Sequence, residues 1–178
     1  MKTFIALTFI GILTYAYGAT TGISECQNVT PMERFSATQF FTGTWYVTHV
    51  QKNTSATVCQ TFTTKDENRT LVVEYSFNDG QENSVRCEGQ RGEEKKVAFK
   101  CKVNDVPKFD ADFIILDTDY NDYALFYRCI TFTSSGSKND NYLVLRRSSG
   151  DQDIPTSLAS LTSKLGLLAC KDIRPPVA

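Results

Sequence analysis

Phe109-Asp-Ala-Asp-Phe-Ile-Ile115 alternates apolar and acidic side chains over its first five residues. Successive side chains of a strand point to opposite faces of a sheet, so Asp110 and Asp112 share one face, and the apolar residues at odd positions share the other. An antiparallel sheet with one face on a core and one face in water has this pattern. The stretch therefore predicts one wall of an antiparallel β fold.

Seven further segments are rich in β-branched and aromatic residues and are separated by turn residues such as Asn78-Asp79-Gly80 and Ser134-Ser135-Gly136. The eight predicted strands are residues 45–50, 58–64, 71–77, 84–87, 95–103, 109–117, 123–133 and 141–147. Consecutive strands with short links favour an eight-stranded up-and-down antiparallel barrel, a size that holds one small ligand. A β-sandwich is the structural alternative.

The alternation also predicts which side chains face the barrel interior. Beyond residues 109–115, the expected inward residues are Leu71, Val73, Tyr75, Val97, Phe99, Leu125 and Tyr127. His49, the only histidine, shares the parity of Trp45 and Val47. It could bind a ligand and change charge near neutral pH, or be a hydrogen-bonded core or rim histidine. The predicted cavity-lining residues are His49, Phe99, Phe113 and Tyr127.

Two helical segments are expected beside the barrel. Residues 35–41 predict a short N-terminal helical turn that covers one barrel end. Residues 154–168 predict a C-terminal helix on the barrel exterior, because Pro155 is tolerated in a first turn and leucines recur at 158, 161, 165 and 168.

The first 18 residues have the features of a secretory signal peptide. Lys2 precedes an apolar run from Phe4 to Tyr15, and small residues precede a cut after Gly18. We expect residues 19–178 to form one secreted domain. No other stretch approaches the length of apolar sequence that a membrane span needs, so no membrane partner is expected.

Charge and modification motifs fit a secreted surface. Without Lys2, 18 of the 19 basic residues remain against 20 acidic ones, with no basic stripe. Nucleic acid is therefore not an expected partner. Glycosylation sequons begin at Asn28, Asn53 and Asn68.

Six cysteines in a secreted chain indicate three disulfides. Cys87 and Cys101 flank a polar turn at residues 89–94, so they are expected to face each other in a hairpin and to pair. The pairing among Cys26, Cys59, Cys129 and Cys170 stays open at this point. Because the chain has one histidine and no CxxC spacing, we expect no metal site and no other cofactor.

The acidic, aromatic segment at residues 117–123 is a candidate protein-binding hairpin through Asp117, Asp119, Tyr120 and Asp122. Its charge would complement a basic exosite of a clotting protease and would speed docking. The same residue types are also ordinary turn chemistry between two strands. Nucleophile-elbow, zinc-protease and phosphate-loop motifs are absent from the sequence, so we do not expect an enzyme.

Three fragments, Gly43-Thr-Trp45-Tyr46, Thr118-Asp119-Tyr120 and Arg146-Arg147, resemble the lipocalin signature. The resemblance implies a structural cation-π contact between Trp45 and Arg147, with Arg146 as the alternative. Longer blocks at residues 41–49, 58–64, 116–125 and 140–145 resemble the triabin-like lipocalins of triatomine bug saliva.

This resemblance implies a secreted salivary lipocalin barrel in which Cys26 pairs with Cys129 and Cys59 with Cys170. Such lipocalins bind host clotting or contact-phase proteins, such as thrombin, factor XII or kininogen, or hold small agonists in the cavity. The expected function is to suppress host haemostasis by binding such a protein. The alternative is to scavenge a thromboxane, leukotriene, ADP or biogenic amine. Haem binding, as in the related nitrophorins, is not expected, because their axial histidine lies on a middle strand and His49 lies on the first.

Overall fold

The computed structural model describes residues 22–54, 59–78, 80–90 and 96–173. The predicted signal peptide and residues 174–178 lie outside these ranges. So do Val58 and Lys95, where two strands were predicted to begin, and residues 91–94 of the predicted turn.

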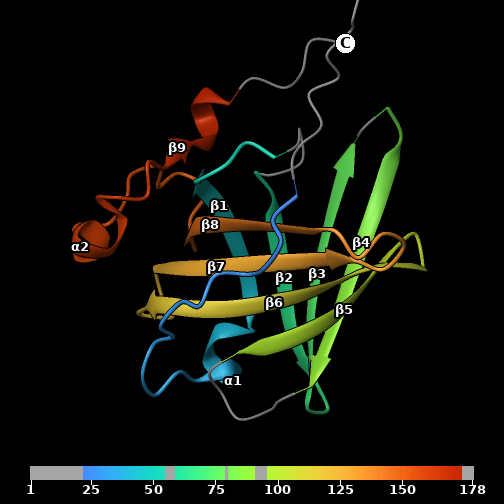
Figure 1. Cartoon of the computed structure of the whole chain (residues 1–178). Helices are drawn as coiled ribbons and strands as arrows, with labels where there is room; N and C mark the ends of the chain where they lie inside the picture. The colour runs from blue at the N-terminus through green and yellow to red at the C-terminus, as the bar shows by residue number, and fades with distance from the viewer. Residues whose placement is uncertain (1–21, 55–58, 79, 91–95, 174–178) are drawn as a thin grey trace, which may run out of the picture.

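Eight antiparallel strands form a closed barrel (Figure 1). They are β1 (Gly43–Val50), β2 (Thr61–Glu67), β3 (Thr70–Asn78), β4 (Glu82–Gln90), β5 (Val97–Val103), β6 (Val106–Thr118), β7 (Tyr123–Phe132) and β8 (Lys138–Arg146). Strands β2 to β8 each pair with the next along the chain, and β1 closes the barrel by pairing with both β2 and β8. The predicted up-and-down barrel is confirmed, and the sandwich alternative is wrong.

Strand limits differ from the prediction chiefly at β2 and β4. Strand β2 begins at Thr61, three residues later than expected, and β4 extends to Gln90. Gly89, which was assigned to a turn, lies in β4 directly opposite Phe99. A Cβ at this position would lie 2.9 Å from the Phe99 ring, so glycine allows the ring to pack against the β4 backbone.

The short helix α1 (Ala37–Phe40) confirms the predicted N-terminal helical turn. Phe40 and Phe41 are buried in the main core beside Trp45. This end of the barrel also carries the β2–β3 and β6–β7 hairpins (Figure 1). We call it the closed end, and we call the end with the β3–β4, β5–β6 and β7–β8 turns the open end.

The C-terminal helix is present, but it is much shorter than predicted. A 3-10 turn η1 (Thr156–Leu158) leads into α2 (Ala159–Thr162). The chain turns at Gly166, whose φ is +61°, and then forms β9 (Leu168–Ala169), which pairs with β1, and the 3-10 turn η2 (Cys170–Asp172). Leu158 is fully buried whereas Leu161 is 42% exposed, so the leucines do not form one helix face.

All three disulfides are confirmed. Cys87 and Cys101 lie directly opposite each other on β4 and β5, with a Cα–Cα distance of 4.0 Å. The other bridges join the terminal segments to the barrel and link Cys26 to Cys129 and Cys59 to Cys170. Within the described ranges, no helix is long and apolar enough to cross a membrane.

Candidate ligand cavity and acidic hairpin

The closed end of the barrel is filled by aromatic side chains. Phe113 contacts Phe99 and Phe126, with ring centroids 4.8 and 5.2 Å apart, and Phe40 stacks on Trp45 at 5.2 Å. The remaining void is about 10 Å³, at the lower limit for a single water molecule. The inward orientation of Phe99 and Phe113 is confirmed, but both pack in this core rather than line an open cavity.

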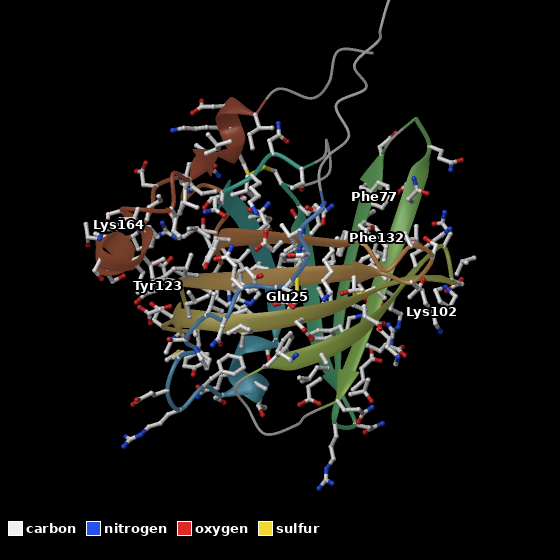
Figure 2. The ribbon with its side chains drawn as sticks, viewed as in Figure 1. Glu25, Phe77, Lys102, Tyr123, Phe132 and Lys164 are labelled. Atoms are coloured by element: carbon white, nitrogen blue, oxygen red, sulfur yellow. A yellow bond between two sulfur atoms is a disulfide. The ribbon has the colours of Figure 1, made fainter. Side chains whose placement is uncertain are left out.

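The open end contains a cavity of about 360 Å³. Figure 2 shows Phe77 and Phe132 near this end, with Tyr123 at the other end of β7. Most of the lining is apolar and comes from Tyr75, Phe77, Val85, Val103, Phe109, Ile130 and Phe132. The polar lining residues are Thr54, Gln60, Lys108, Arg128, Ser134 and Asn139.

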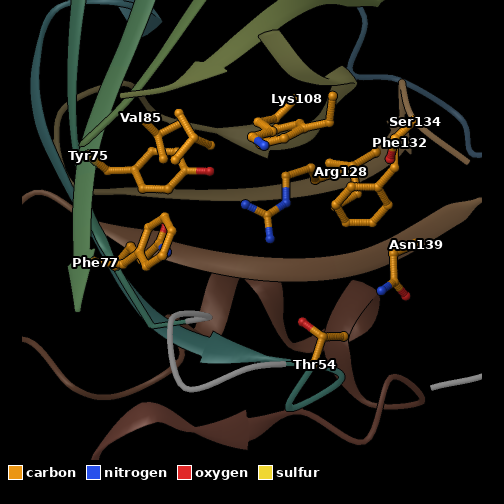
Figure 3. Close-up of a pocket in the computed structure, with 13 residues that line it drawn as sticks. Thr54, Tyr75, Phe77, Val85, Lys108, Arg128, Phe132, Ser134 and Asn139 are labelled. Carbon is orange, nitrogen blue, oxygen red and sulfur yellow. The ribbon is translucent and has the colours of Figure 1, made fainter. Parts of the chain in front are cut away.

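Arg128 lies in the middle of this cavity (Figure 3). Its guanidinium extends from β7 between Tyr75 and Phe77 on one side and Phe132 on the other. It forms no hydrogen bond or ion pair with any residue that the structure describes. Burial lowers its pKa, and the nearby Tyr75 acts in the opposite direction. Because arginine keeps its proton in proteins, the cavity contains a permanent positive charge.

His49 does not point into the barrel, so its predicted inward orientation is wrong. The pairing of β1 with β8 shifts between Val47 and His49, which identifies a bulge at Thr48. A bulge reverses the parity of the residues that follow it. Val50 therefore joins the core, whereas His49 lies outside, opposite Ala169 of β9. Burial and Lys171 lower the pKa of His49, so the imidazole is neutral at pH 7.

Leu125 and Tyr127 also point outward, contrary to the prediction. Strand β7 has apolar residues on both faces because the terminal segments cover its outer face. Leu125 packs with Leu158 beneath the C-terminal segment, and Tyr127 packs with Cys26 and Cys129 beneath the N-terminal one. The inward residues of β7 are those at even positions, including Phe126 and Arg128.

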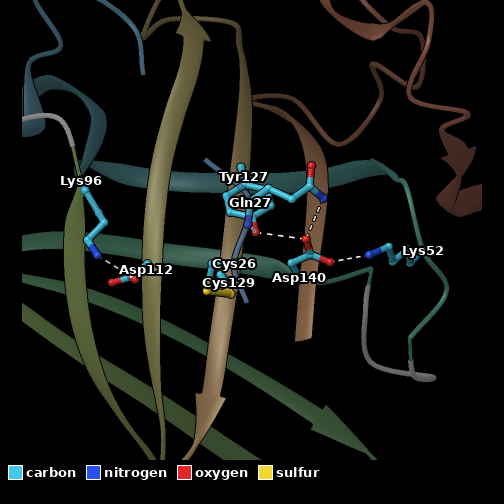
Figure 4. Close-up of a disulfide and its surroundings, with 8 residues drawn as sticks. All are labelled: Cys26, Gln27, Lys52, Lys96, Asp112, Tyr127, Cys129 and Asp140. Atoms are coloured by element: carbon cyan, nitrogen blue, oxygen red, sulfur yellow. Dashed lines mark hydrogen bonds and ion pairs between the residues drawn. A yellow bond between two sulfur atoms is a disulfide. The ribbon is translucent and has the colours of Figure 1, made fainter. Parts of the chain in front are cut away.

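Tyr127 belongs to a buried polar network on the outer wall (Figure 4). Its hydroxyl accepts a hydrogen bond from the Gln27 N–H and donates one to Asp140, and Lys52 forms an ion pair with the same carboxylate. Burial raises the pKa of Tyr127. The pKa of Asp140 lies below its usual value. Burial alone would raise it, but hydrogen bonds from Lys52, Gln27 and Tyr127 stabilise the carboxylate by more than burial destabilises it. The network holds the chain leaving β1 against β8.

The acidic hairpin lies at the closed end, and two of its carboxylates have structural partners. Asp119 accepts hydrogen bonds from the backbone N–H groups of Asn121, Asp122 and Tyr123. Asp122 pairs with Arg146 at 3.0 Å. These contacts agree with the alternative interpretation of this segment, in which the same residues form an ordinary turn between two strands.

Tyr120 and Asp117 complete the hairpin. The Tyr120 hydroxyl accepts the Ser36 N–H at 2.9 Å, and its ring stacks on Phe35. Asp117 is half-buried and forms no hydrogen bond or ion pair within the described ranges.

Trp45 and Arg147 form the predicted cation-π contact, with the Arg147 Cζ atom 3.6 Å from the indole centroid. The guanidinium donates to the carbonyl groups of Thr44 and Tyr120, and the indole N–H donates to the Phe40 carbonyl. This contact closes the barrel end. Arg146, the alternative, points outward to Asp122 and Asp151.

The three sequon asparagines, Asn28, Asn53 and Asn68, are all exposed. Their glycosylation stays a prediction. No group of three or more His, Cys, Asp or Glu side chains in the described part of the chain could hold a metal ion.

Sequence reasoning missed the cavity's most informative residue, Arg128. It also missed Gln60 and Lys108, and it placed Tyr75 inward without assigning it to the cavity. One signal was available: Arg128 is the one charged residue in the largely apolar stretch from Ala124 to Ile130. Because the even-numbered residues of β7 face the barrel interior, Arg128 points inward.

An eight-stranded barrel with one packed end and one hollow end defines a lipocalin-type binding protein. Residues 20–161 match the family model described as Triabin. The chain therefore belongs to the triabin family of lipocalins.

Two relatives and one solved structure show the extent of the similarity. The chain is 39% identical to Procalin of Hospesneotomae protracta over 96% of its length and 99% of that protein. It is 42% identical to Triabin of Meccus pallidipennis over 86% of its length and 96% of that protein. The structure of an LTBP1 mutant in complex with leukotriene C4 is 30% identical and superposes with a TM-score of 0.64, covering 79% of this chain and 89% of that one.

Proposed function

We propose that this protein is a secreted salivary lipocalin that takes up a small host mediator in its open-end cavity and thereby suppresses host haemostasis. The observation that carries the proposal is the largely apolar cavity of about 360 Å³, which lies within the size range of small-molecule sites. The similar LTBP1 structure, with leukotriene C4 bound, supports a ligand-holding barrel. The signal-like leader and three disulfides support secretion.

Calorimetric titration of the mature, disulfide-bonded protein tests this function. The panel is a leukotriene, a stable thromboxane analogue, ADP and serotonin. We expect one-to-one binding of at least one compound, and we expect Phe132→Glu to weaken it because a carboxylate then replaces a ring of the apolar wall. Val106→Glu is the matched control, since Val106 is 52% exposed at the start of the adjacent strand. Failure of every compound to bind would contradict the proposal.

The second candidate is binding of a host clotting or contact-phase protein by the closed-end hairpin. The half-buried Asp117 favours it, because this carboxylate has no hydrogen-bond or ion-pair partner among the described residues. We expect the protein to prolong contact-activated clotting and Asp117→Lys to abolish the effect. Asp110→Lys reverses an exposed charge on a neighbouring stretch of the same strand and is the control. Unchanged clotting time with the unmodified protein would exclude this candidate, and prolongation that Asp117→Lys leaves intact would exclude the hairpin as its site.

A further inference from the structure

The lining of the open-end cavity has an unbalanced charge. Among its thirteen residues are two basic side chains, Lys108 and Arg128, and no acidic one. The acidic residues nearest in sequence on β6, Asp110 and Asp112, belong to the outer face, where they pair with Lys100 and Lys96. Asp140 on β8 is also engaged outside, with Lys52. None of these carboxylates neutralises the cavity.

The neighbours of Arg128 on the adjacent strands do not neutralise it either. Its cross-strand partners are Phe113 on β6 and Asn141 on β8. The Asn141 side-chain amide is already used, since it accepts the N–H groups of Gln51 and Lys52 and donates to the Lys52 carbonyl. A charge among protein atoms without a counter-ion is costly, so it marks a place where a bound anion would be favourable.

The chemistry of the remaining lining defines the rest of the ligand. Aromatic and aliphatic side chains surround the guanidinium, among them Tyr75, Phe77 and Phe132 (Figure 3). They offer contact to an apolar chain, whereas the planar guanidinium offers two parallel N–H donors to a carboxylate or similar group. A cationic ligand would gain the same apolar contact but would be repelled by Arg128.

We infer that the cavity selects an acidic amphiphile: an anionic head group bound by Arg128 and an apolar chain held against the aromatic wall, with amines excluded. This inference rests on the proposed small-ligand function and narrows its ligand class from lipids, nucleotides and amines to anionic amphiphiles.

A second polar group adds a requirement along the chain of the ligand. Gln60 lines the same cavity, and its Oε1 atom is buried without a hydrogen-bond donor among the residues that the structure describes. An unsatisfied buried acceptor is stabilised by any donor brought to it. The preferred ligand therefore carries a hydroxyl or N–H group in addition to its acidic head.

A fluorescence titration with cis-parinaric acid, a polyene fatty acid, tests the head-group claim. The neutral probe is its methyl ester, and the cationic probe is an alkylamine of matched length used as a competitor. We expect the acid to bind the unmodified protein about 10- to 100-fold more tightly than the ester. Arg128→Gln should remove this difference by weakening the acid and leaving the ester within about threefold, because only the acid uses the guanidinium.

Lys102→Gln is the matched control, because Lys102 is exposed on the outer face of β5 and does not line the cavity. We expect it to change acid binding by less than about threefold. Circular dichroism and intact disulfides establish that each variant is folded. Equal affinity for acid and ester, or unchanged acid binding by Arg128→Gln, would overturn the inference while leaving a ligand-binding barrel. Absence of binding by the acid would also overturn the inference, and it would contradict the proposed function as well only if every compound of the mediator panel failed to bind.

Competition between ricinoleic and oleic acids, which differ by one hydroxyl group, tests the role of Gln60. We expect ricinoleic acid to displace the probe at about a fivefold lower concentration, and Gln60→Leu to abolish that preference. If ricinoleic and oleic acids displace the probe from the unmodified protein at equal concentrations, Gln60 does not select for a hydroxyl group.

Discussion

The two ends of this barrel are built from the same strands and differ in what fills them. At the closed end, Phe113, Phe126 and Trp45 leave a void of about 10 Å³, whereas the open end has a cavity of about 360 Å³. The packed end contains much of the buried aromatic core, and the hollow end has room for the small ligand proposed above. We therefore expect substitutions at the closed end to alter stability and substitutions at the open end to alter ligand binding.

Truncating one phenylalanine at each end tests this division with the largest expected effect. Phe126→Ala removes a buried ring from the closed end and should lower the free energy of unfolding by about 3–5 kcal/mol. Phe132→Ala borders an existing cavity and should cost less than about 1.5 kcal/mol, because its ring is only half-buried. Urea denaturation with the disulfides intact measures both. Equal losses would show that the two ends are packed alike.

The outer network near the open end makes a smaller, pH-dependent contribution. The Asp140 side chain is 1% exposed, and we expect Asp140→Asn to cost roughly 1.5–3 kcal/mol at pH 7. The pKa of Asp140 is lowered on folding. Its contribution is therefore complete above the unfolded-state pKa, about 3.9, and is lost as the pH falls through the lower folded-state pKa.

Denaturation of the unmodified protein and Asp140→Asn at pH 7 and pH 2.5 checks this. The gap in stability between the two proteins should narrow at the lower pH. A gap of constant size would show that the carboxylate charge is unimportant to the network.

Arg128 should behave in the opposite way from a packing residue. In the ligand-free protein, Arg128→Met replaces a charge that has no ion-pair partner among the described residues by an apolar chain of similar length. This variant should raise the free energy of unfolding by about 1 kcal/mol. Thermal or urea denaturation without ligand measures the gain. A loss of stability in this variant would indicate that the arginine is structural.

The smallest effect is expected for His49, on the outer wall. Its folded-state pKa is lowered by burial and by Lys171, so the unfolded chain binds a proton more readily. The stability associated with neutral His49 is present above pH 6.5 and declines as the pH falls through that value and then through the folded-state pKa. His49→Gln should flatten this decline between pH 7.5 and 5 by a few tenths of a kcal/mol to about 1 kcal/mol. It should leave cavity binding unchanged, and weakened binding would place His49 in the ligand site after all.

Much of the fold could be predicted from the sequence where one face of a strand meets water. Strand β6 shows this, because Asp110 and Asp112 identify its outer face without ambiguity. The pairing of Cys87 with Cys101 followed from the same hairpin logic, and it is confirmed.

The errors arose where alternation is interrupted or carries no information. The bulge at Thr48 reverses the parity of His49, and one extra residue in a strand has no distinct signal in a single sequence. Strand β7 is buried on both faces, so Leu125 and Phe126 are equally apolar. The helix after Pro155 ends early because Gly166 turns the chain toward its pairing with β1. The inward position of Arg128 depends on the parity of β7, which explains why the fold was easier to predict than the cavity.

A methyl NMR titration tests the contrast between the two ends most directly. Val85, Val103 and Ile130 report on the open-end cavity, and Val73 and Leu145 report on the closed-end void. On addition of ricinoleic acid, we predict saturable shifts for the three open-end residues and none for the two closed-end residues. Shifts at the closed end, or at neither end, would contradict the assignment of the ligand site to the open end of the barrel.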